Sequence, residues 1–259
     1  MATTGRVPVR LSEAEVKQLA QDFQGKSPRE LLTWAADKFG DRLTVCSSFQ
    51  AEGCSIIDMA WRINPKIRVF TIDTGRTPQE TYVVVDKIRE KYGIEVEVYL
   101  PDVAEIEKMV HEKGVNLFYK SIENRFMCCD VRKVHPLNKV LTTRNIDAWI
   151  TGVRRSQAET RSKTAMIDID KEHGGIIKLN PLAEWTSKDV WDYIKANDVP
   201  YNELYDKGFT SIGCWPCTRA IQPGEDERAG RWWWELDAAK ECGIIIDPKT
   251  AKVTRADPK

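Results

Sequence analysis

Short apolar segments alternate with longer amphipathic segments through the first half of the chain, and this alternation constrains the fold more than any other feature. The expected strands and helices follow one another in the order 43–47, 55–63, 67–72, 78–92, 95–100 and 103–113. Strands that are joined through a helix lie parallel in one sheet. The sequence therefore predicts an α/β fold, in which a parallel twisted sheet is flanked by helices on both faces.

The segments on either side of this region carry their own start signals. Two capping boxes, at 12–15 and 27–30, open helices before the first strand. After residue 113 we expect a largely helical stretch, a strand, a hairpin that turns at Gly174-Gly175, and a further helix. Their ranges are 118–145, 147–151, 166–179 and 186–197.

The composition limits the class of protein. The chain has 259 residues, with 39 Lys and Arg against 39 Asp and Glu, so its formal net charge is zero, which speaks against a general nucleic-acid binder. No apolar run approaches membrane-spanning length and the N-terminus has no apolar signal-peptide core, so we expect a soluble, cytoplasmic protein. No repeat or linker divides the chain. We expect a single domain over 1–259, with an α/β core at about 40–220 and a C-terminal segment at about 221–259.

The cysteines form a pattern that suits metal or redox chemistry. There are seven, an odd number that does not suit a disulfide framework in a long, non-secreted chain. Cys128-Cys129 would strain a disulfide, and Cys214-Trp215-Pro216-Cys217 is a Cys-x-x-Cys half-site. Four thiolates in two pairs suit zinc or an iron–sulfur cluster, and a redox Cys-x-x-Cys beside two buried thiols is a third reading. Spacing alone leaves these readings open.

Polar turns follow the first two expected strands. Ser47 and Ser48 open the turn after the first strand, and their hydroxyl groups and the following N–H groups suit a phosphate or a ribose. Asp73 ends the second strand, where it would lie near a ribose or adenine, or cap the next helix. Ligands of parallel sheets bind beyond the carboxyl ends of the strands, so we expect these side chains to share one site.

Several Lys and Arg residues stand where an anionic ligand would need them. Two of them follow Cys129 by three and four residues, about one helical turn away. Arginine suits bidentate contacts to phosphate or sulfate oxygens, and the ordinary alternative for each residue is a solvated surface position. The candidates for substrate binding are Arg132, Lys133, Arg154, Arg161, Arg228 and Arg231.

Six stretches together resemble one family. They are Ser47-Ser48-Phe49, Ile72-Asp73-Thr74-Gly75-Arg76, Cys128-Cys129 with Arg132-Lys133, residues 151–157, residues 213–219 and Lys240-Glu241-Cys242-Gly243. In this ordered combination the chain resembles the assimilatory adenylyl-sulfate (APS) and phosphoadenylyl-sulfate (PAPS) reductases, from about residue 40 to about residue 243. The resemblance implies a fold like that of the adenine nucleotide α-hydrolases.

The resemblance also implies a cofactor. Within the family, two cysteine pairs mark the members that carry an iron–sulfur cluster, and these are mostly APS reductases. The chain is therefore expected to be an APS reductase of assimilatory sulfate reduction, with one [4Fe–4S] cluster per chain. The implied cluster ligands are Cys128, Cys129, Cys214 and Cys217.

The reaction implied by the resemblance uses a different cysteine. Cys242 would attack the sulfur of APS, release AMP and form an S-sulfocysteine, from which thioredoxin or a similar dithiol protein would release sulfite. A mobile C-terminal segment would suit a thiol that meets both a substrate and a partner protein. The chain departs from the family after Gly243, because Ile244-Ile245-Ile246 stands where Leu-His usually follows. The role of that His has no counterpart at this position. The sequence does not report the oligomeric state, and a homo-oligomer is compatible with it.

Three other readings compete with this one. The substrate could be PAPS, or both nucleotides, although no extra cation for a 3′-phosphate is evident. A tRNA-modifying sulfurtransferase of the ATP-pyrophosphatase type would have a Ser-Gly-Gly-x-Asp-Ser loop, but Phe49 and Gln50 stand in place of the glycines. The third is a non-enzymatic zinc or nucleotide-binding module.

Overall fold

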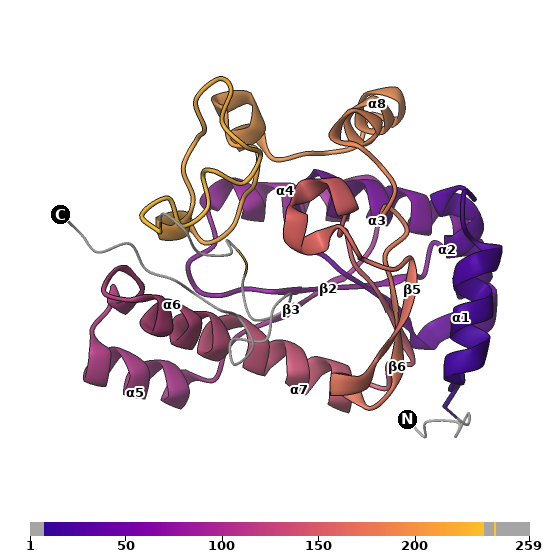
Figure 1. Cartoon of the computed structure of the whole chain (residues 1–259), viewed down its shortest axis with the longest axis horizontal. Helices are drawn as coiled ribbons and strands as arrows, with labels where there is room; N and C mark the ends of the chain where they lie inside the picture. Colours follow the sequence, from indigo (N-terminus) through magenta and orange to yellow (C-terminus); the bar gives the residue numbers. More distant parts are fainter. Residues whose placement is uncertain (1–7, 236–240, 242–259) are drawn as a thin grey trace.

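The computed structural model describes residues 8–235 and residue 241; of the expected C-terminal segment, residues 236–240 and 242–259, which include Cys242, lie outside the described residues. Six strands form one sheet in the order β3-β2-β1-β4-β6-β5 (Figure 1). They are β1 (Leu43–Cys46), β2 (Arg68–Ile72), β3 (Val96–Tyr99), β4 (Ala148–Ile150), β5 (Ile167–Asp170) and β6 (Ile176–Leu179).

The sheet is parallel except at one edge. β1 pairs in parallel with both β2 and β4. It lies inside the sheet, with β2 and β3 on one side and β4, β6 and β5 on the other. β5 runs antiparallel to β6, because the two strands form the hairpin that was expected to turn at Gly174-Gly175. The α/β class is confirmed, with this antiparallel edge strand as the refinement.

Within the part of the chain that the structure describes, eight α-helices flank the sheet. They are α1 (Glu13–Asp22), α2 (Pro28–Phe39), α3 (Ala51–Ile63), α4 (Gln79–Tyr92), α5 (Val103–Lys113), α6 (Ile122–Cys129), α7 (His135–Thr143) and α8 (Ser187–Asn197). In Figure 1, α3, α4 and α8 lie on one side of the sheet and α5, α6 and α7 on the other. This is the two-faced covering that the alternation predicted.

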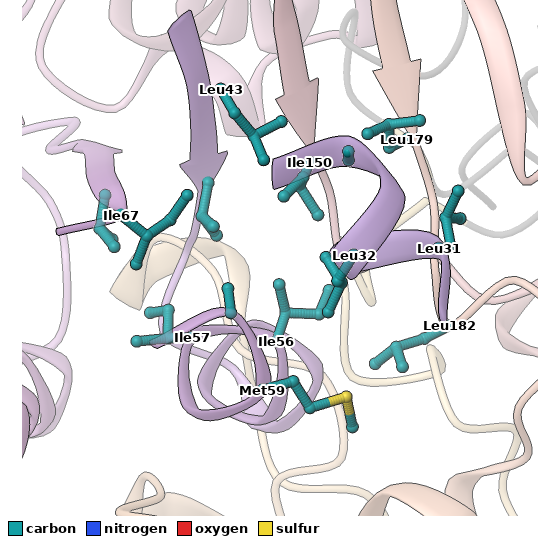
Figure 2. Packing of buried hydrophobic residues seen from close by; sticks show 14 of the residues in the cluster. Leu31, Leu32, Leu43, Ile56, Ile57, Met59, Ile67, Ile150, Leu179 and Leu182 are labelled. Atoms are coloured by element: carbon teal, nitrogen blue, oxygen red, sulfur yellow. The ribbon is translucent and has the colours of Figure 1, made fainter. Parts of the chain in front are cut away.

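Two apolar clusters hold these layers together. On one face, Ile56 and Ile57 of α3 are fully buried in the same cluster as Leu43 of β1 and Ile150 of β4 (Figure 2). On the other face, Leu137 of α7 packs in a second cluster with strand residues of β2, β4 and β6. Each such aliphatic side chain contributes about 1.5–3 kcal/mol by burial. The central strands are thereby packed between apolar clusters on both faces.

The two helix starts that capping boxes predicted are confirmed, but the start of the helix after β1 was predicted wrongly. The capping boxes at Ser12 and Ser27 are both present, with the side-chain and backbone bonds expected of them. The helix expected at 55–63 was placed too late: α3 begins at Ala51, directly after the serine turn. Because Gln50 at the N-cap makes no side-chain capping bond, the sequence carried no capping signal there.

The largely helical stretch predicted at 118–145 is interrupted at a functional position. α6 ends at Cys129, a π-helical turn, η3 (Asp130–Val134), follows, and α7 continues. The wider turn changes the direction of the side chains that follow the cysteine pair. None of the helices in residues 8–235 has the length and apolarity that a membrane-spanning helix needs.

Candidate active site

A cavity of about 230 Å³, here called the main cavity, lies at the carboxyl ends of the central strands. Its wall includes Ser47 and Ser48 after β1, Thr74 after β2, and Thr151 and Gly152 after β4. This is the position that the parallel topology predicts for a ligand.

The main cavity gathers cations from distant parts of the chain. Of the residues predicted to bind the substrate, those that line it are Ser47, Ser48, Lys133, Arg161, Arg228 and Arg231. The described carboxylates in the same wall are Glu52, Glu227 and Glu241. The chemistry of the wall is therefore that of an anion site whose charge is partly balanced from within the protein.

The serine turn is locally strained. Ser47 is buried, and its hydroxyl oxygen accepts a hydrogen bond of 3.0 Å from the amide of Phe49. Phe49 is fully buried with a φ of 54°, in the left-handed region that bulky side chains rarely adopt. Gln50 ties the turn to the far wall, because its side-chain oxygen accepts from the amide of Ile212 at 2.8 Å. Burial of Phe49 in the core holds the turn in this shape.

Arg154 does not line the main cavity but supports its wall. Its guanidinium donates to Glu52 at 2.8 Å and to Glu227 at 2.7 Å, and its side chain is only 2% exposed. Burial raises the pKa of the Glu227 carboxyl, and the positive charge of Arg154 opposes that rise. Arg154 thus joins α3 to the loop that carries Arg228.

Asp73 and Arg132 also do not line the main cavity, and their side chains bond to other groups of the protein. The Asp73 carboxylate accepts bonds from the Gly75 amide at 2.8 Å and from the Tyr82 hydroxyl at 2.8 Å, so it organises the turn before α4. Arg132 donates to the carbonyl oxygen of Thr74 at 2.7 Å and is buried. Of the pair after Cys129, it is Lys133 that lines the main cavity.

The segment from Ser211 to Trp232 positions Arg228 and Arg231. The backbone of Arg231 forms an isolated antiparallel β-bridge with that of Thr218. A Cβ on Gly213 would lie 2.3 Å from the Arg231 guanidinium, so the glycine leaves room for this side chain. Ser211 accepts from both arginines, at 3.3 Å from Arg228 and 3.4 Å from Arg231. Both guanidinium groups are thereby directed to one wall of the cavity.

Glu241 accepts hydrogen bonds from arginines at both its side chain and its main chain. Its carboxylate accepts two bonds from Arg161, at 2.6 and 2.7 Å, and one from Arg228 at 2.9 Å. Its carbonyl oxygen accepts a bond of 2.6 Å from Arg125. Burial would raise the pKa of the carboxyl, but Arg161 and Arg228 hold it below its usual value. The predicted nucleophile, Cys242, is the next residue and lies outside the described residues.

The four paired cysteines line a second, smaller cavity, here called the cysteine cavity. Cys128, Cys129, Cys214 and Cys217 all contribute to its wall. Apolar side chains that include Met109, Leu117 and Phe118 pack around Cys128 and Cys217. No group of three His, Cys, Asp or Glu side chains within residues 8–235 and 241 is arranged to hold a single metal ion. The cysteines come together around a shared cavity instead.

Unsatisfied donors surround the cysteine cavity. Arg132 Nε, Arg231 Nε and Trp232 Nε1 are buried without a hydrogen-bond partner, and all three residues line it. Buried N–H groups rarely remain unpaired. Burial raises the pKa of the free Cys217 thiol to about 12, and Cys214 adds to the rise while Arg231 opposes it. The unpartnered donors suit an acceptor-rich group in this cavity.

The two cavities share a wall. Lys133 and Arg231 line both, as do Thr74, Cys214 and Trp232. A group in the cysteine cavity and an anion in the main cavity would therefore face some of the same side chains.

A comparison with known families identifies this architecture. The family model described as "phosphoadenosine phosphosulfate reductase domain" matches residues 42–220 of this chain. The chain belongs to the phosphoadenosine phosphosulfate reductase domain family. The resemblance that the sequence motifs indicated is confirmed.

Individual members of the reductase family match most of the chain. A protein of Pseudomonas aeruginosa (strain LESB58), named adenosine 5'-phosphosulfate reductase, is 43% identical over 235 residues, which cover 89% of this chain and 86% of that protein. One of Burkholderia cepacia with the same name is 47% identical over 206 residues, or 80% and 81% of the two chains. A rice protein, probable 5'-adenylylsulfate reductase 1, chloroplastic, is 41% identical, and the match covers 49% of its length.

Solved structures agree with the family assignment. The crystal structure of PAPS reductase from Candida auris, a phosphate complex, has a TM-score of 0.70 and 30% identity, covering 83% of this chain and 100% of that chain. FMN adenylyltransferase from Candida glabrata in complex with ATP has a TM-score of 0.52 at 14% identity, covering 80% and 65%. The second likeness shows the fold alone.

Sequence reasoning missed the partners of the predicted arginines. Glu52 and Glu227, the partners of Arg154, carried no motif. Arg125, which donates to Glu235 at 3.0 and 2.8 Å, was not singled out either. Only the position of Arg125, one helical turn before Cys129, could have drawn attention to it.

Proposed function

We propose that this chain reduces APS to sulfite and AMP, as the adenylyl-sulfate reductase of an assimilatory sulfate-reduction pathway that serves cysteine biosynthesis. The observation that carries the proposal is the shared wall between the cation-lined main cavity and the cysteine cavity. Lys133 and Arg231, which belong to both, would bring a bound sulfate next to a group held by the cysteines. The relatives named adenosine 5'-phosphosulfate reductase support the same substrate.

The substrate would bind as a nucleotide with two anionic groups. Ser47 and Ser48 are proposed to contact the phosphate or ribose, and Lys133, Arg228 and Arg231 the phosphate and sulfate oxygens. Arg161 is a further cation in the wall, already paired with Glu241. Arg132, Arg154 and Asp73 are proposed to act through the wall that they support, since none of them lines the main cavity.

The chemistry would consist of two sulfur displacements. The Cys242 thiolate attacks the sulfur of APS, an S–S bond forms, and the bond from that sulfur to the bridging oxygen breaks with AMP as the leaving group. A thiolate of the partner then attacks the Cys242 sulfur and sulfite leaves with the bonding electrons. The second partner thiol resolves the mixed disulfide, so Cys242 returns to a thiol and the partner is oxidised by two electrons.

We propose that Cys128, Cys129, Cys214 and Cys217 hold a [4Fe–4S] cluster. Four thiolates are the usual ligand set of such a cluster. The unpartnered buried donors of Arg132, Arg231 and Trp232 support the assignment, because cluster sulfides and thiolates accept hydrogen bonds. When bound, the cluster supplies structural linkage and local charge, while the electrons come from thiols.

The proposed reductant is thioredoxin or a similar dithiol protein, which the displacement chemistry requires. The proposed compartment is the cytoplasm, where thiols stay reduced; the six cysteines in the described residues are all free, which is compatible with it. The family resemblance is also compatible with a homo-oligomer.

An anaerobic assay tests the proposal. The purified protein should be brown, contain iron and sulfide, and release sulfite from APS in the presence of reduced thioredoxin. Cys242→Ser should abolish sulfite release and keep the colour. Turnover of PAPS but not of APS would contradict the substrate assignment, and the PAPS reductase relative makes this the alternative to measure.

A further inference from the structure

Glu241 belongs to the Lys240-Glu241-Cys242-Gly243 motif, in which only Cys242 was given a role. It is only 1% exposed although it is charged, and it directly precedes the proposed nucleophile. We infer that Glu241, Arg161 and Arg125 form a clamp that positions Cys242 for attack, and that Arg161 serves this clamp rather than the substrate. The inference rests on the proposed role of Cys242.

The side-chain half of the clamp is geometrically specific. Arg161 donates from Nε and from a terminal nitrogen to the two carboxylate oxygens of Glu241, at 2.6 and 2.7 Å. Such parallel bonds fix the orientation of a carboxylate as well as its position. Thr160 adds a bond of 3.1 Å from the same turn, η5 (Glu159–Arg161). The other terminal nitrogen of Arg161 donates to Gln157 at 2.6 Å, so the guanidinium is held by groups of the protein.

The main-chain half comes from a different layer of the protein. Arg125 of α6 is completely buried and donates to the Glu241 carbonyl oxygen at 2.6 Å. It is itself fixed by two bonds to Glu235 and by the rings of Phe126 and Trp232, whose centroids lie 4.0 and 4.6 Å from its guanidinium carbon. A residue that is held at both its carboxylate and its carbonyl group has little remaining freedom.

The position of the clamp explains why it would matter for the reaction. Glu241 lines the main cavity, and consecutive Cα atoms are about 3.8 Å apart. The proposed nucleophile is therefore covalently joined to a residue of the cavity wall. Fixing a reacting group near its target accelerates a reaction, and a misplacement of about 1 Å can reduce the rate by roughly 10²-fold. The clamp would contribute to the rate more than to substrate affinity.

The test separates positioning from binding. Glu241→Gln and Arg161→Gln should each lower kcat by about 10-fold to 10²-fold, with KM for APS and Kd for AMP changed by less than about 3-fold. The double variant should lose little more than either single variant, because the two residues act as one unit. Glu184→Gln is the matched control: it removes the 3.1 Å ion pair with Arg155, neither residue lines either cavity, and the substitution should leave kcat unchanged.

A second readout does not need turnover. Iodoacetamide labelling of Cys242, followed at the peptide level by mass spectrometry, should be several-fold faster in Glu241→Gln and Arg161→Gln than in the wild type or in Glu184→Gln. Unfolding midpoints and iron content are compared to show that each variant is folded. If labelling is unchanged, or if KM rises in step with the fall in kcat/KM, the clamp is refuted.

The two proposals fail in different ways. A wild-type protein that labels as expected but releases no sulfite from APS would contradict the proposed function and leave the clamp standing. A wild-type protein that is an active APS reductase, with additive effects of the two substitutions, would contradict the clamp alone.

Discussion

The guanidinium of Arg132 donates a hydrogen bond of 2.7 Å to the carbonyl oxygen of Thr74, and the Thr74 hydroxyl lies 3.1 Å from Cys214 Sγ. A single residue just after β2 therefore connects the helical segment after Cys129 with the second cysteine pair. Thr74 also lines both cavities. The sheet edge, and not the cysteine segments alone, sets the geometry of the proposed cluster site.

Replacing Arg132 should weaken this connection. Arg132→Gln removes a buried, charged hydrogen bond, so we expect the free energy of unfolding to fall by about 1.5–3 kcal/mol and the iron content of the purified protein to fall with it. Urea unfolding and iron analysis measure the two effects. Lys139→Gln, an exposed substitution on α7, should change neither. Full iron content and wild-type stability in Arg132→Gln would show that Thr74 needs no such support.

Removing one proposed cluster ligand should remove the cluster. Cys128→Ser or Cys214→Ser is expected to yield protein with little iron, little sulfide and no brown colour, since a serine hydroxyl is a poor substitute for a thiolate. Cys46→Ser is the matched control: this thiol lines the main cavity, and burial raises its pKa to about 12, but it does not line the cysteine cavity. Loss of iron in the Cys46 variant and not in the Cys128 variant would refute the ligand assignment.

The fold could be predicted from the sequence because its signals are local. Two helix starts are marked by capping boxes, at Ser12 and Ser27. The turn of the β5–β6 hairpin is marked by its glycines. The start of α3 was missed since Gln50 carries no capping signal, and a tertiary bond from the Ala51 amide to the Tyr205 hydroxyl, at 3.1 Å, satisfies that helix end instead.

The site was harder to predict because its electrostatics are long-range. Motif and spacing indicated which arginines gather near the cavity, but not which of them meet a carboxylate. Arg154 meets Glu52 and Glu227, which are 102 and 73 residues away in the sequence. Such pairs follow from the fold of the whole chain, and a single sequence carries no local trace of them.

Arg154 should therefore be more important for stability than its motif alone suggests. Arg154→Gln leaves the Glu52 and Glu227 carboxylates close to each other without their shared cation, and breaking a buried pair in this way costs about 3–5 kcal/mol. Urea unfolding measures the loss. Arg155→Gln affects a half-exposed guanidinium in the same loop and should cost under about 1 kcal/mol. Equal effects of the two substitutions would contradict this account.

Asp170 should make stability depend on pH. Burial alone would raise its pKa, but hydrogen bonds and charge from His173, with the indole N–H of Trp149 at 2.9 Å, hold the pKa below the ordinary 3.8. A carboxylate with a lowered folded-state pKa stabilises the fold above its unfolded-state pKa, and this contribution is lost as the pH falls through the folded-state value. Asp170→Asn should thus cost about 1–3 kcal/mol at pH 7.

The difference between the wild type and Asp170→Asn should shrink below about pH 4, because protonation then removes the same charge from the wild-type residue. Urea unfolding of both proteins between pH 7 and pH 3 measures this difference. Asp168→Asn, an exposed position on the same strand, is the control and should show no such trend. A gap that stays constant or widens toward pH 3 would mean that Asp170 acts by shape and not by charge.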